Sequence, residues 1–304
     1  MITTVLNERD NIDEFMKSVI NQTRKPDEFI IVDGGSVDGT YEILKKYSKK
    51  YKWIKVLQVK GCTIGGGRNI AIENSKYKII ACTDAGCILD KNWLKEITEP
   101  FKRKNVDVVV GIYRPYYKND FEYFEGLIIV PSAEKIFMNP SRMSSRSIAF
   151  KKECWKRVGG YPNLKVGEDT RFNISLIEMG CKFYFARNAV VYWKMRESLT
   201  GLFNQFYNYG YGDRISGNLF KIKTNLLFVA FFWVYIFLLA SSLLFFPVFP
   251  KLLIMLPFLY FLFEGLKVYS KSGKISGIFY GFVIILIKRV AYVLGATCGK
   301  LKSF

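Results

Sequence analysis

The stretch Ile31-Val32-Asp33-Gly34-Gly35-Ser36-Val37-Asp38-Gly39-Thr40 decides the fold that this sequence predicts. It follows a short apolar run, residues 28–32, with a glycine turn, and it offers a helix start at Ser36 or Asp38. The two glycines fall where the backbone can pass close to a ligand. The spacing is not GxGxxG, so the dinucleotide-binding fingerprint is absent.

The same alternation of strand and helix extends on both sides of this turn. Residues 53–59 and 77–83 read as further strands, with helical spacing between residues 12 and 20, 41 and 51, and 69 and 75. Strands separated by helices predict an α/β domain with a mostly parallel sheet and flanking helices. Ligands bind beyond the carboxyl ends of such strands. Those positions hold Glu8, Asp33, the predicted glycine turn Gly65-Gly66-Gly67-Arg68, and Asp84.

The charged residues limit the catalytic groups and the partners that this sequence allows. The 304 residues include 45 Lys plus Arg, 26 Asp plus Glu and no histidine, for a net charge of +19. Without imidazole, histidine triads and histidine-ligated metals are excluded, so acid–base chemistry falls to carboxylates or lysines. The positive charge indicates an anionic partner, such as a phosphorylated substrate or an acidic membrane face. No nucleic-acid-binding module is visible, so we expect no nucleic acid partner.

The composition changes near Asn225. Residues 226–246 are 21 residues without a charge, which as a helix span about 30 Å, the thickness of a bilayer core. Residues 252–263 fit the return arm of a hairpin that turns at Pro247 and Pro250. A third apolar stretch, residues 275–287, precedes Lys288-Arg289 and fits a re-entrant or interfacial helix at least as well as a crossing.

We therefore predict a domain over residues 1–220 and a membrane region over residues 221–304 with two or three hydrophobic helices. Lysines flank both arms of the predicted hairpin, and positive flanks lie on the cytosolic side. The sequence predicts a multi-pass membrane protein whose residues 1–220 are cytosolic. The flanking lysines are Lys221, Lys223, Lys267, Lys271 and Lys274.

Three segments together resemble family 2 glycosyltransferases, which have the GT-A nucleotide-sugar-binding fold. They are Leu6-Asn7-Glu8, Gln22-Thr23 and the Ile31–Thr40 stretch, which match the family in order and spacing. Gly67-Arg68-Asn69 and Thr83-Asp84-Ala85-Gly86 continue the resemblance. It implies a GT-A domain that binds a nucleotide-sugar donor.

The resemblance also implies roles for single residues. Glu8 and Asp33 would hold the ribose and base, and Arg68 would stand near the base or the diphosphate. Asp84 would begin the family's Asp-x-Asp element and bind Mg²⁺ or Mn²⁺, which prefer carboxylate oxygen. The second aspartate is replaced by Gly86. Metal binding would then rest on Asp84 and the diphosphate oxygens, so we expect a weakened dependence on the divalent cation.

The segment Val166-Gly167-Glu168-Asp169-Thr170-Arg171-Phe172 resembles the family's acceptor-site motif. By that resemblance Glu168 belongs to the acceptor site and Asp169 is the general base. Taken alone, adjacent carboxylates at a helix start only complement the helix dipole. Farther on, Arg214 either stabilises the leaving diphosphate or belongs to an arginine and tyrosine cluster at the bilayer surface.

The resulting expectation is an inverting glycosyltransferase at the cytosolic membrane face. It would transfer a sugar to a hydroxyl of a lipid-linked or membrane-proximal acceptor, and the expected partner is a lipid-linked or glycan acceptor. Two alternatives stay open. A polyprenyl-phosphate sugar synthase has the same fold, but its phosphate acceptor is already ionised and needs no base. A noncatalytic membrane scaffold that binds nucleotide is compatible with Gly86.

Overall fold

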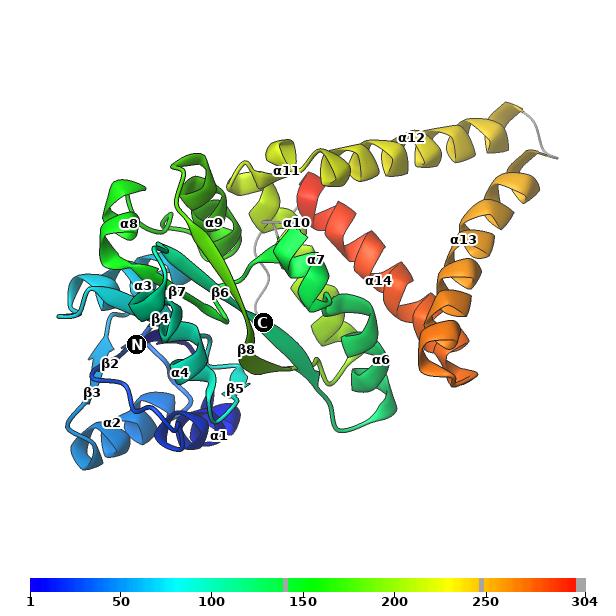
Figure 1. Cartoon of the computed structure of the whole chain (residues 1–304). Helices are drawn as coiled ribbons and strands as arrows, with labels where there is room; N and C mark the ends of the chain where they lie inside the picture. Colours follow the sequence, from blue (N-terminus) through cyan, green and yellow to red (C-terminus); the bar gives the residue numbers. More distant parts are fainter. Residues whose placement is uncertain (139–141, 246–248, 299–304) are drawn as a thin grey trace. The chain divides into compact units, whose positions relative to one another are not determined.

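A computed structural model describes residues 1–138, 142–245 and 249–298 of the chain (Figure 1). The chain divides into two compact units. Unit 1 comprises Met1–Tyr116 and Pro131–Lys194, and unit 2 comprises Tyr117–Val130 and Met195–Phe304. The predicted boundary at residue 220 stays a prediction for the functional domains.

The first half of unit 1 alternates strands and helices, as the apolar spacing predicts. Strand β2 consists of five buried residues, and α1 buries Ile12, Phe15, Met16 and Val19 at helical spacing. The buried residues of β2 and α1 belong to the core of unit 1, which supports the loops that follow the strands. The elements are β1 (Ile2–Val5), α1 (Arg9–Ile20), β2 (Phe29–Asp33), α2 (Thr40–Lys50), β3 (Ile54–Gln58), α3 (Ile64–Glu73) and β4 (Ile79–Cys82).

The second half of unit 1 completes one eight-stranded sheet of order β3-β2-β1-β4-β7-β6-β8-β5. Strands β1 to β4 pair in parallel, and β6 pairs in parallel with β8. Strand β7 is antiparallel to β4 and β6, and β5 is antiparallel to β8, so the sheet is mixed. The remaining elements are β5 (Cys87–Leu89), α4 (Trp93–Thr98), α5 (Pro100–Arg103), β6 (Val108–Tyr116), α7 (Ala133–Met138), β7 (Ile148–Lys151), α8 (Lys152–Arg157), α9 (Glu168–Glu178) and β8 (Phe183–Lys194).

The glycines predicted as a turn after the third strand form the first turn of α3 instead. Thr63 caps the helix by accepting the Gly66 N–H at 2.9 Å. A Cβ on Gly65 would lie 1.9 Å from the Pro162 carbonyl oxygen, and one on Gly67 would lie 2.8 Å from the Thr4 methyl carbon. The glycines are therefore required for close packing of the helix, and the prediction of a turn was wrong.

Unit 2 consists of helices that approach one another closely at glycines. A Cβ on Gly210 of α10 would lie 2.0 Å from the Tyr292 carbonyl oxygen of α14. A Cβ on Gly265 of α13 would lie 2.4 Å from the Ile278 carbonyl oxygen of α14. Small residues of this kind allow helix backbones to pack tightly. The helices are α6 (Asp120–Ile129), α10 (Leu199–Ile215), α11 (Asn218–Lys221), α12 (Lys223–Phe245), α13 (Phe249–Ser272) and α14 (Ser276–Cys298).

Within the described residues, two helices are long and apolar enough to cross a membrane. They cover Lys223–Ser242 of α12 and Ser276–Thr297 of α14. The predicted return arm is part of α13, which carries Glu264, Lys267 and Lys271 and is not one of the two. Pro250, predicted at the turn, lies in the first turn of α13, while Pro247 lies outside the described residues.

Helix α14 runs without interruption through Lys288 and Arg289. The Lys288 ammonium lies 5.2 Å from the centre of the Phe206 ring, and the Arg289 guanidinium lies 4.5 Å from that of Phe228. Both cations thus face aromatic rings of unit 2, which lowers their cost in an apolar helix. The number of membrane crossings stays a prediction.

Glu125 of α6 is a buried carboxyl that gives unit 2 a pH-dependent stability. It is 0% exposed, and its Oε2 accepts the Arg196 N–H at 2.8 Å. Burial raises the pKa of Glu125 from 4.5 to about 7. Because the folded state holds this proton more tightly than the unfolded state, the folded state loses stability as the pH rises from about 4.5 to 7.

We expect Glu125→Gln to remove this loss, which amounts to about 3 kcal/mol at most. The melting temperature of the wild-type chain in detergent should fall more between pH 5 and pH 8 than that of the variant. Exposed Glu197 of the same unit supplies the control, Glu197→Gln. An equal pH dependence in wild type and Glu125→Gln would contradict the assignment.

Candidate active site

The loops after β1 and β2 are tied to each other in unit 1. Asn7 adopts a left-handed conformation with φ of 54°. Its side-chain oxygen accepts the Val37 N–H at 3.0 Å, and its own N–H donates to Ser36 Oγ at 2.9 Å. The Glu8 N–H donates to Thr40 Oγ1 at 2.8 Å. Glu8 is thereby held beside the turn that follows β2, where the sequence predicts it.

Asp33 holds that turn together. It is 0% exposed, and its Oδ1 accepts hydrogen bonds from Ser36 Oγ at 2.6 Å and the Ser36 N–H at 3.0 Å. Its Oδ2 accepts a hydrogen bond from the Gln58 side-chain amide at 2.9 Å, and no sequence pattern pointed to this contact. Both carboxylate oxygens are therefore engaged within unit 1. Recognition of the nucleobase by Asp33 stays a prediction.

Arg68 contacts two other residues singled out in the sequence, Asp84 and Glu168. It lies in α3, its side chain is 3% exposed, and its Nη2 pairs with Asp84 Oδ1 at 2.8 Å. Its Nη1 pairs with Glu168 Oε1 at 2.5 Å. Burial alone would lower the pKa of Arg68, but the two carboxylates raise it above its ordinary value. The guanidinium therefore stays charged between the strand end of β4 and the first turn of α9.

Glu168 is the more deeply buried of the two carboxylates that Arg68 contacts. Burial raises the pKa of Glu168 from 4.5 to about 7, although Arg68 opposes this rise. The charge of neighbouring Asp169 raises it further. Because Arg68 is shared by two carboxylates, its charge does not fully offset the free-energy cost of burying the charged form of Glu168.

Asp169 is half-buried in the first turn of α9, and both of its oxygens accept hydrogen bonds. Oδ2 accepts from Ser144 Oγ at 3.1 Å and from the Ser145 N–H at 3.4 Å. Oδ1 accepts the Thr170 N–H at 2.7 Å. These contacts fix the direction of the carboxylate, which a general base requires. The sequence did not point to Ser144 or Ser145.

Arg146 is a second arginine at Asp84, and we had not predicted it as a site residue. Its Nε lies 3.8 Å from Asp84 Oδ2, and its Nη1 donates to Ser144 Oγ at 2.9 Å. The guanidinium lies 4.0 Å from the centre of the Trp193 ring. No sequence pattern marked Arg146 as a site residue, because Asp84 and Trp193 come from distant segments of the chain.

The residues at Asp84 fit a cation that takes most of its ligands from a bound diphosphate. Within residues 1–138, 142–245 and 249–298, no three His, Cys, Asp or Glu side chains are grouped to hold a metal ion. The Asp84 side chain is 29% exposed, so it can reach a ligand. A Cβ on Gly86 would meet no atom within 4 Å, so there is room where a second aspartate would stand.

Arg214 belongs to unit 2, in α10. Its Nη1 donates to the Thr297 carbonyl oxygen at 2.7 Å, and its guanidinium lies 5.7 Å from the centre of the Tyr211 ring. The hydrogen bond to Thr297 anchors α10 to α14, whereas Tyr211 lies in α10 itself. Both predicted roles for Arg214, at the diphosphate and at the bilayer surface, stay predictions.

The fold is shared by solved glycosyltransferases of the GT-A type. The mannosyltransferase PcManGT from Pyrobaculum calidifontis, in complex with GDP-Man and Mn²⁺, matches with a TM-score of 0.63 at 16% identity. The match covers 94% of this chain and 85% of PcManGT. The structure of S. aureus TarS residues 1–349 matches with a TM-score of 0.54 at 19% identity over 71% of this chain and 64% of that one.

The chain belongs to glycosyl transferase family 2, whose family model matches residues 1–160. The predicted GT-A fold and the family resemblance are confirmed.

Curated relatives agree with that family. Glycosyltransferase AglE of Haloferax volcanii is 27% identical over 62% of this chain and 64% of its own length. Cholesterol galactosyltransferase of Borreliella burgdorferi is 27% identical over 38% of this chain and 33% of its own length. The chain therefore spans between one third and just under two thirds of these relatives.

Proposed function

We propose that this chain is an inverting glycosyltransferase that moves a sugar from a nucleotide-sugar donor to a hydroxyl of a lipid-linked or glycan acceptor. The observation that carries the proposal is the position of Arg68. Its guanidinium pairs with Asp84 of the predicted nucleotide-sugar site and with Glu168 of the predicted acceptor site. Asp169 directly follows Glu168. A donor at Asp84 and an acceptor at Asp169 would thus meet within one unit.

In the proposed reaction, Asp169 removes the proton from the acceptor hydroxyl as its oxygen attacks the anomeric carbon. The nucleoside diphosphate leaves from the opposite side, and one such displacement inverts the anomeric configuration. Hydrogen bonds from Ser144, Ser145 and Thr170 hold the Asp169 carboxylate in one orientation. A base fixed in this way contributes about 100- to 10,000-fold to the rate of transfer.

The donor would lie along the loops after β1 and β2 and beside Asp84. Glu8 and Asp33 are proposed for the ribose and base, and Arg214 for the leaving diphosphate. Asp84 would hold Mg²⁺ or Mn²⁺ against the diphosphate, and such a cation neutralises charge on the leaving group. PcManGT, whose structure contains GDP-Man and Mn²⁺, supports this class of donor and cation.

The acceptor distinguishes this proposal from a polyprenyl-phosphate sugar synthase. The oriented carboxylate of Asp169 favours a hydroxyl acceptor, because an ionised phosphate needs no base. Membership of a glycosyltransferase family supports an enzyme over a noncatalytic scaffold.

The test incubates the full chain in detergent with UDP-, GDP- and dTDP-sugars, Mn²⁺ and either polyprenyl phosphate or hydroxyl-bearing glycolipids. We expect a glycolipid product with a new glycosidic bond. A sugar found only on polyprenyl phosphate would replace the proposal with the synthase, and absence of transfer or hydrolysis from every donor would favour the scaffold.

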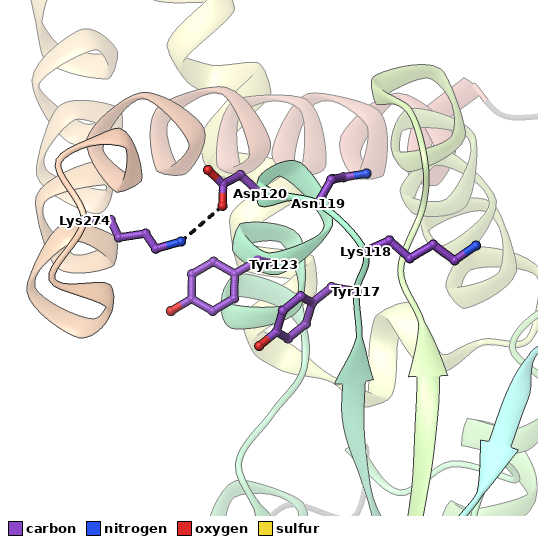
Figure 2. Close-up of a pocket in the computed structure, with 6 residues that line it drawn as sticks. All are labelled: Tyr117, Lys118, Asn119, Asp120, Tyr123 and Lys274. Carbon is purple, nitrogen blue, oxygen red and sulfur yellow. Dashed lines mark hydrogen bonds and ion pairs between the residues drawn. The ribbon is translucent and has the colours of Figure 1, made fainter.

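We also propose that unit 2 attaches the enzyme to the cytosolic face of a membrane as a multi-pass anchor. Phe231 and Phe237 of α12 are 69% and 70% exposed, and only 6% of the Lys223–Ser242 span is buried. A cavity of about 320 Å³ in unit 2 is lined by tyrosines and lysines, residue types that gather at bilayer surfaces (Figure 2). Its lining is Tyr117, Lys118, Asn119, Asp120, Tyr123 and Lys274, and Lys274 pairs with Asp120 at 3.1 Å.

Expressed in cells, the chain should therefore remain in the membrane pellet after extraction at alkaline pH. The double variant Phe231→Glu/Phe237→Glu should shift into the soluble fraction, because a charge in the bilayer core costs about 2.5–3.5 kcal/mol. Exchange of exposed Val37 of unit 1 for Glu is the control. Extraction of the wild-type chain into the soluble fraction would contradict membrane attachment.

A further inference from the structure

Arg289 of unit 2 carries a guanidinium that the described part of the protein leaves without a hydrogen-bond partner. It lies in α14, within the apolar span Ser276–Thr297. Its Nε is buried, and none of its side-chain nitrogens donates a hydrogen bond to a residue that the structure describes. Buried polar groups nearly always have a partner, and an ionisable residue in an apolar helix often marks a binding site. A ligand from outside the protein would supply that partner.

The aromatic contact of Arg289 places it near the start of α12. Its guanidinium lies 4.5 Å from the centre of the Phe228 ring. The apolar span of α12 begins at Lys223, so Phe228 lies about 8 Å along that span. Lys221 and Lys223 are the lysines predicted to mark this end of α12 as cytosolic. The long side chain of an arginine can extend from this depth to the lipid headgroups.

The end of α14 and the start of α12 pack against each other and against α10 (Figure 1). Val229 of α12 and Val293 of α14 are buried in one apolar cluster. Asp213 of α10 accepts hydrogen bonds from Tyr292 Oη at 2.7 Å and from Asn225 Nδ2 at 3.3 Å. Arg289 therefore lies where three helices are held together, and its position is set by packing.

The charge of this region favours an anion. Residues 210–232 and 284–298, which we call the helix junction, contain one carboxylate and five cationic side chains. The carboxylate is Asp213, which accepts the two hydrogen bonds from Tyr292 and Asn225. A cationic surface at the cytosolic end of membrane helices attracts anionic lipid headgroups. The cations are Arg214, Lys221, Lys223, Lys288 and Arg289.

We propose that Arg289 binds the phosphate group of a membrane lipid at the helix junction. The inference rests on the proposed membrane attachment of unit 2. A guanidinium can donate two parallel hydrogen bonds to phosphate oxygens, a geometry that an ammonium lacks. The lipid tails would lie along exposed apolar side chains of α12, such as Phe231, which is 69% exposed and follows Phe228 by about one turn.

The test measures lipid retention by native mass spectrometry on the full chain in detergent, after removal of copurified lipid. Phosphatidylglycerol, polyprenyl phosphate or phosphate-free diacylglycerol is added. We expect the wild-type chain to retain at least one of the two phosphate-bearing lipids and not diacylglycerol. Retention of phosphatidylglycerol alone would assign the site to bulk phospholipid, and retention of polyprenyl phosphate alone would assign it to an isoprenoid carrier.

Arg289→Gln should bind the retained lipid about 10- to 100-fold more weakly, because hydrogen bonds between charged groups are lost. Arg289→Lys should lie between the two, since it keeps the charge and loses the paired geometry. Lys271→Gln, at an exposed lysine of α13, is the matched control and should bind like the wild type. Equal weakening by Lys271→Gln and Arg289→Gln would show a general attraction and overturn the site, as would equal affinity of Arg289→Gln and wild type.

Thermal unfolding separates lipid binding from a structural role of Arg289. Without added lipid, Arg289→Gln should melt no lower than the wild type, because no hydrogen bond to the described residues is lost. The retained lipid should raise the melting temperature of the wild type more than that of the variant. A variant that melts lower without lipid and gains as much from it would assign Arg289 to packing alone.

Failure of this site and failure of membrane attachment give different results. After extraction at alkaline pH, Arg289→Gln should remain in the membrane pellet like the wild type, because the exposed apolar face of α12 is unchanged. A wild-type chain that stays in the pellet but retains neither phosphate-bearing lipid would overturn the lipid site and leave the attachment intact. A wild-type chain in the soluble fraction would overturn the attachment itself.

Discussion

Asp169→Asn is expected to lower the rate of sugar transfer by about 100- to 10,000-fold, the range that a positioned general base contributes. The amide has the shape of the carboxylate but cannot accept the proton of the acceptor hydroxyl. Affinity for the nucleotide sugar should be unchanged, because the Asp169 carboxylate bonds to Ser144, Ser145 and Thr170 and is assigned no contact with the donor.

The measurement is the initial rate of transfer to a hydroxyl acceptor together with donor affinity by calorimetry. Glu153→Gln, at an exposed carboxylate of α8, is the control and should retain the wild-type rate. Transfer by Asp169→Asn at the wild-type rate would remove Asp169 as the base.

Arg68→Met is expected to destabilise unit 1 by about 3–5 kcal/mol, the cost of removing one partner of a buried ion pair. Asp84 and Glu168 would both lose their guanidinium contact, and Glu168 would be left 6% exposed. We expect the melting temperature to fall by roughly 10 °C at pH 8.

The stability that Arg68→Met loses should be smaller at lower pH. The direction of this pH dependence follows from the pKa of Glu168. Its pKa is already raised to about 7 by burial, and removal of Arg68 raises it further. A carboxyl whose pKa is raised on folding costs stability above its unfolded value of 4.5 and little below it. The deficit relative to wild type should therefore be smaller at pH 5 than at pH 8.

Arg24→Met is the matched control, since Arg24 pairs with Asp27 at the surface, where the two side chains are 36% and 55% exposed. Such pairs contribute about 0–1 kcal/mol. The double variant Arg68→Met/Glu168→Gln should recover part of the lost stability. Equal melting temperatures of Arg68→Met and wild type at pH 8 would contradict a structural role for this ion pair.

Much of unit 1 could be predicted from local sequence. Apolar runs located β2, β3 and β4 to within two residues at either end, because buried parallel strands are continuous and hydrophobic. The predicted ends of β1, β2 and β4 led to Glu8, Asp33 and Asp84. Their identification needed only the rule that ligands bind at the carboxyl ends of the strands.

What could not be predicted depends on contacts between distant segments. The glycines before Arg68 have the composition of a turn, and only their packing against Thr4 and Pro162 shows why a helix needs glycine there. Arg146 reaches Asp84, Ser144 and Trp193, which come from separate segments of the chain that the sheet brings together. The burial of Glu125 likewise depends on packing that its own helix does not reveal.

Transfer by a single displacement assisted by Asp169 inverts the anomeric configuration, so the decisive measurement is the configuration of the product. Nuclear magnetic resonance of the product formed from an α-linked nucleotide sugar reports the coupling at the anomeric proton. We expect a β-linked product. An α-linked product would mean that configuration is retained, and it would contradict the proposed mechanism.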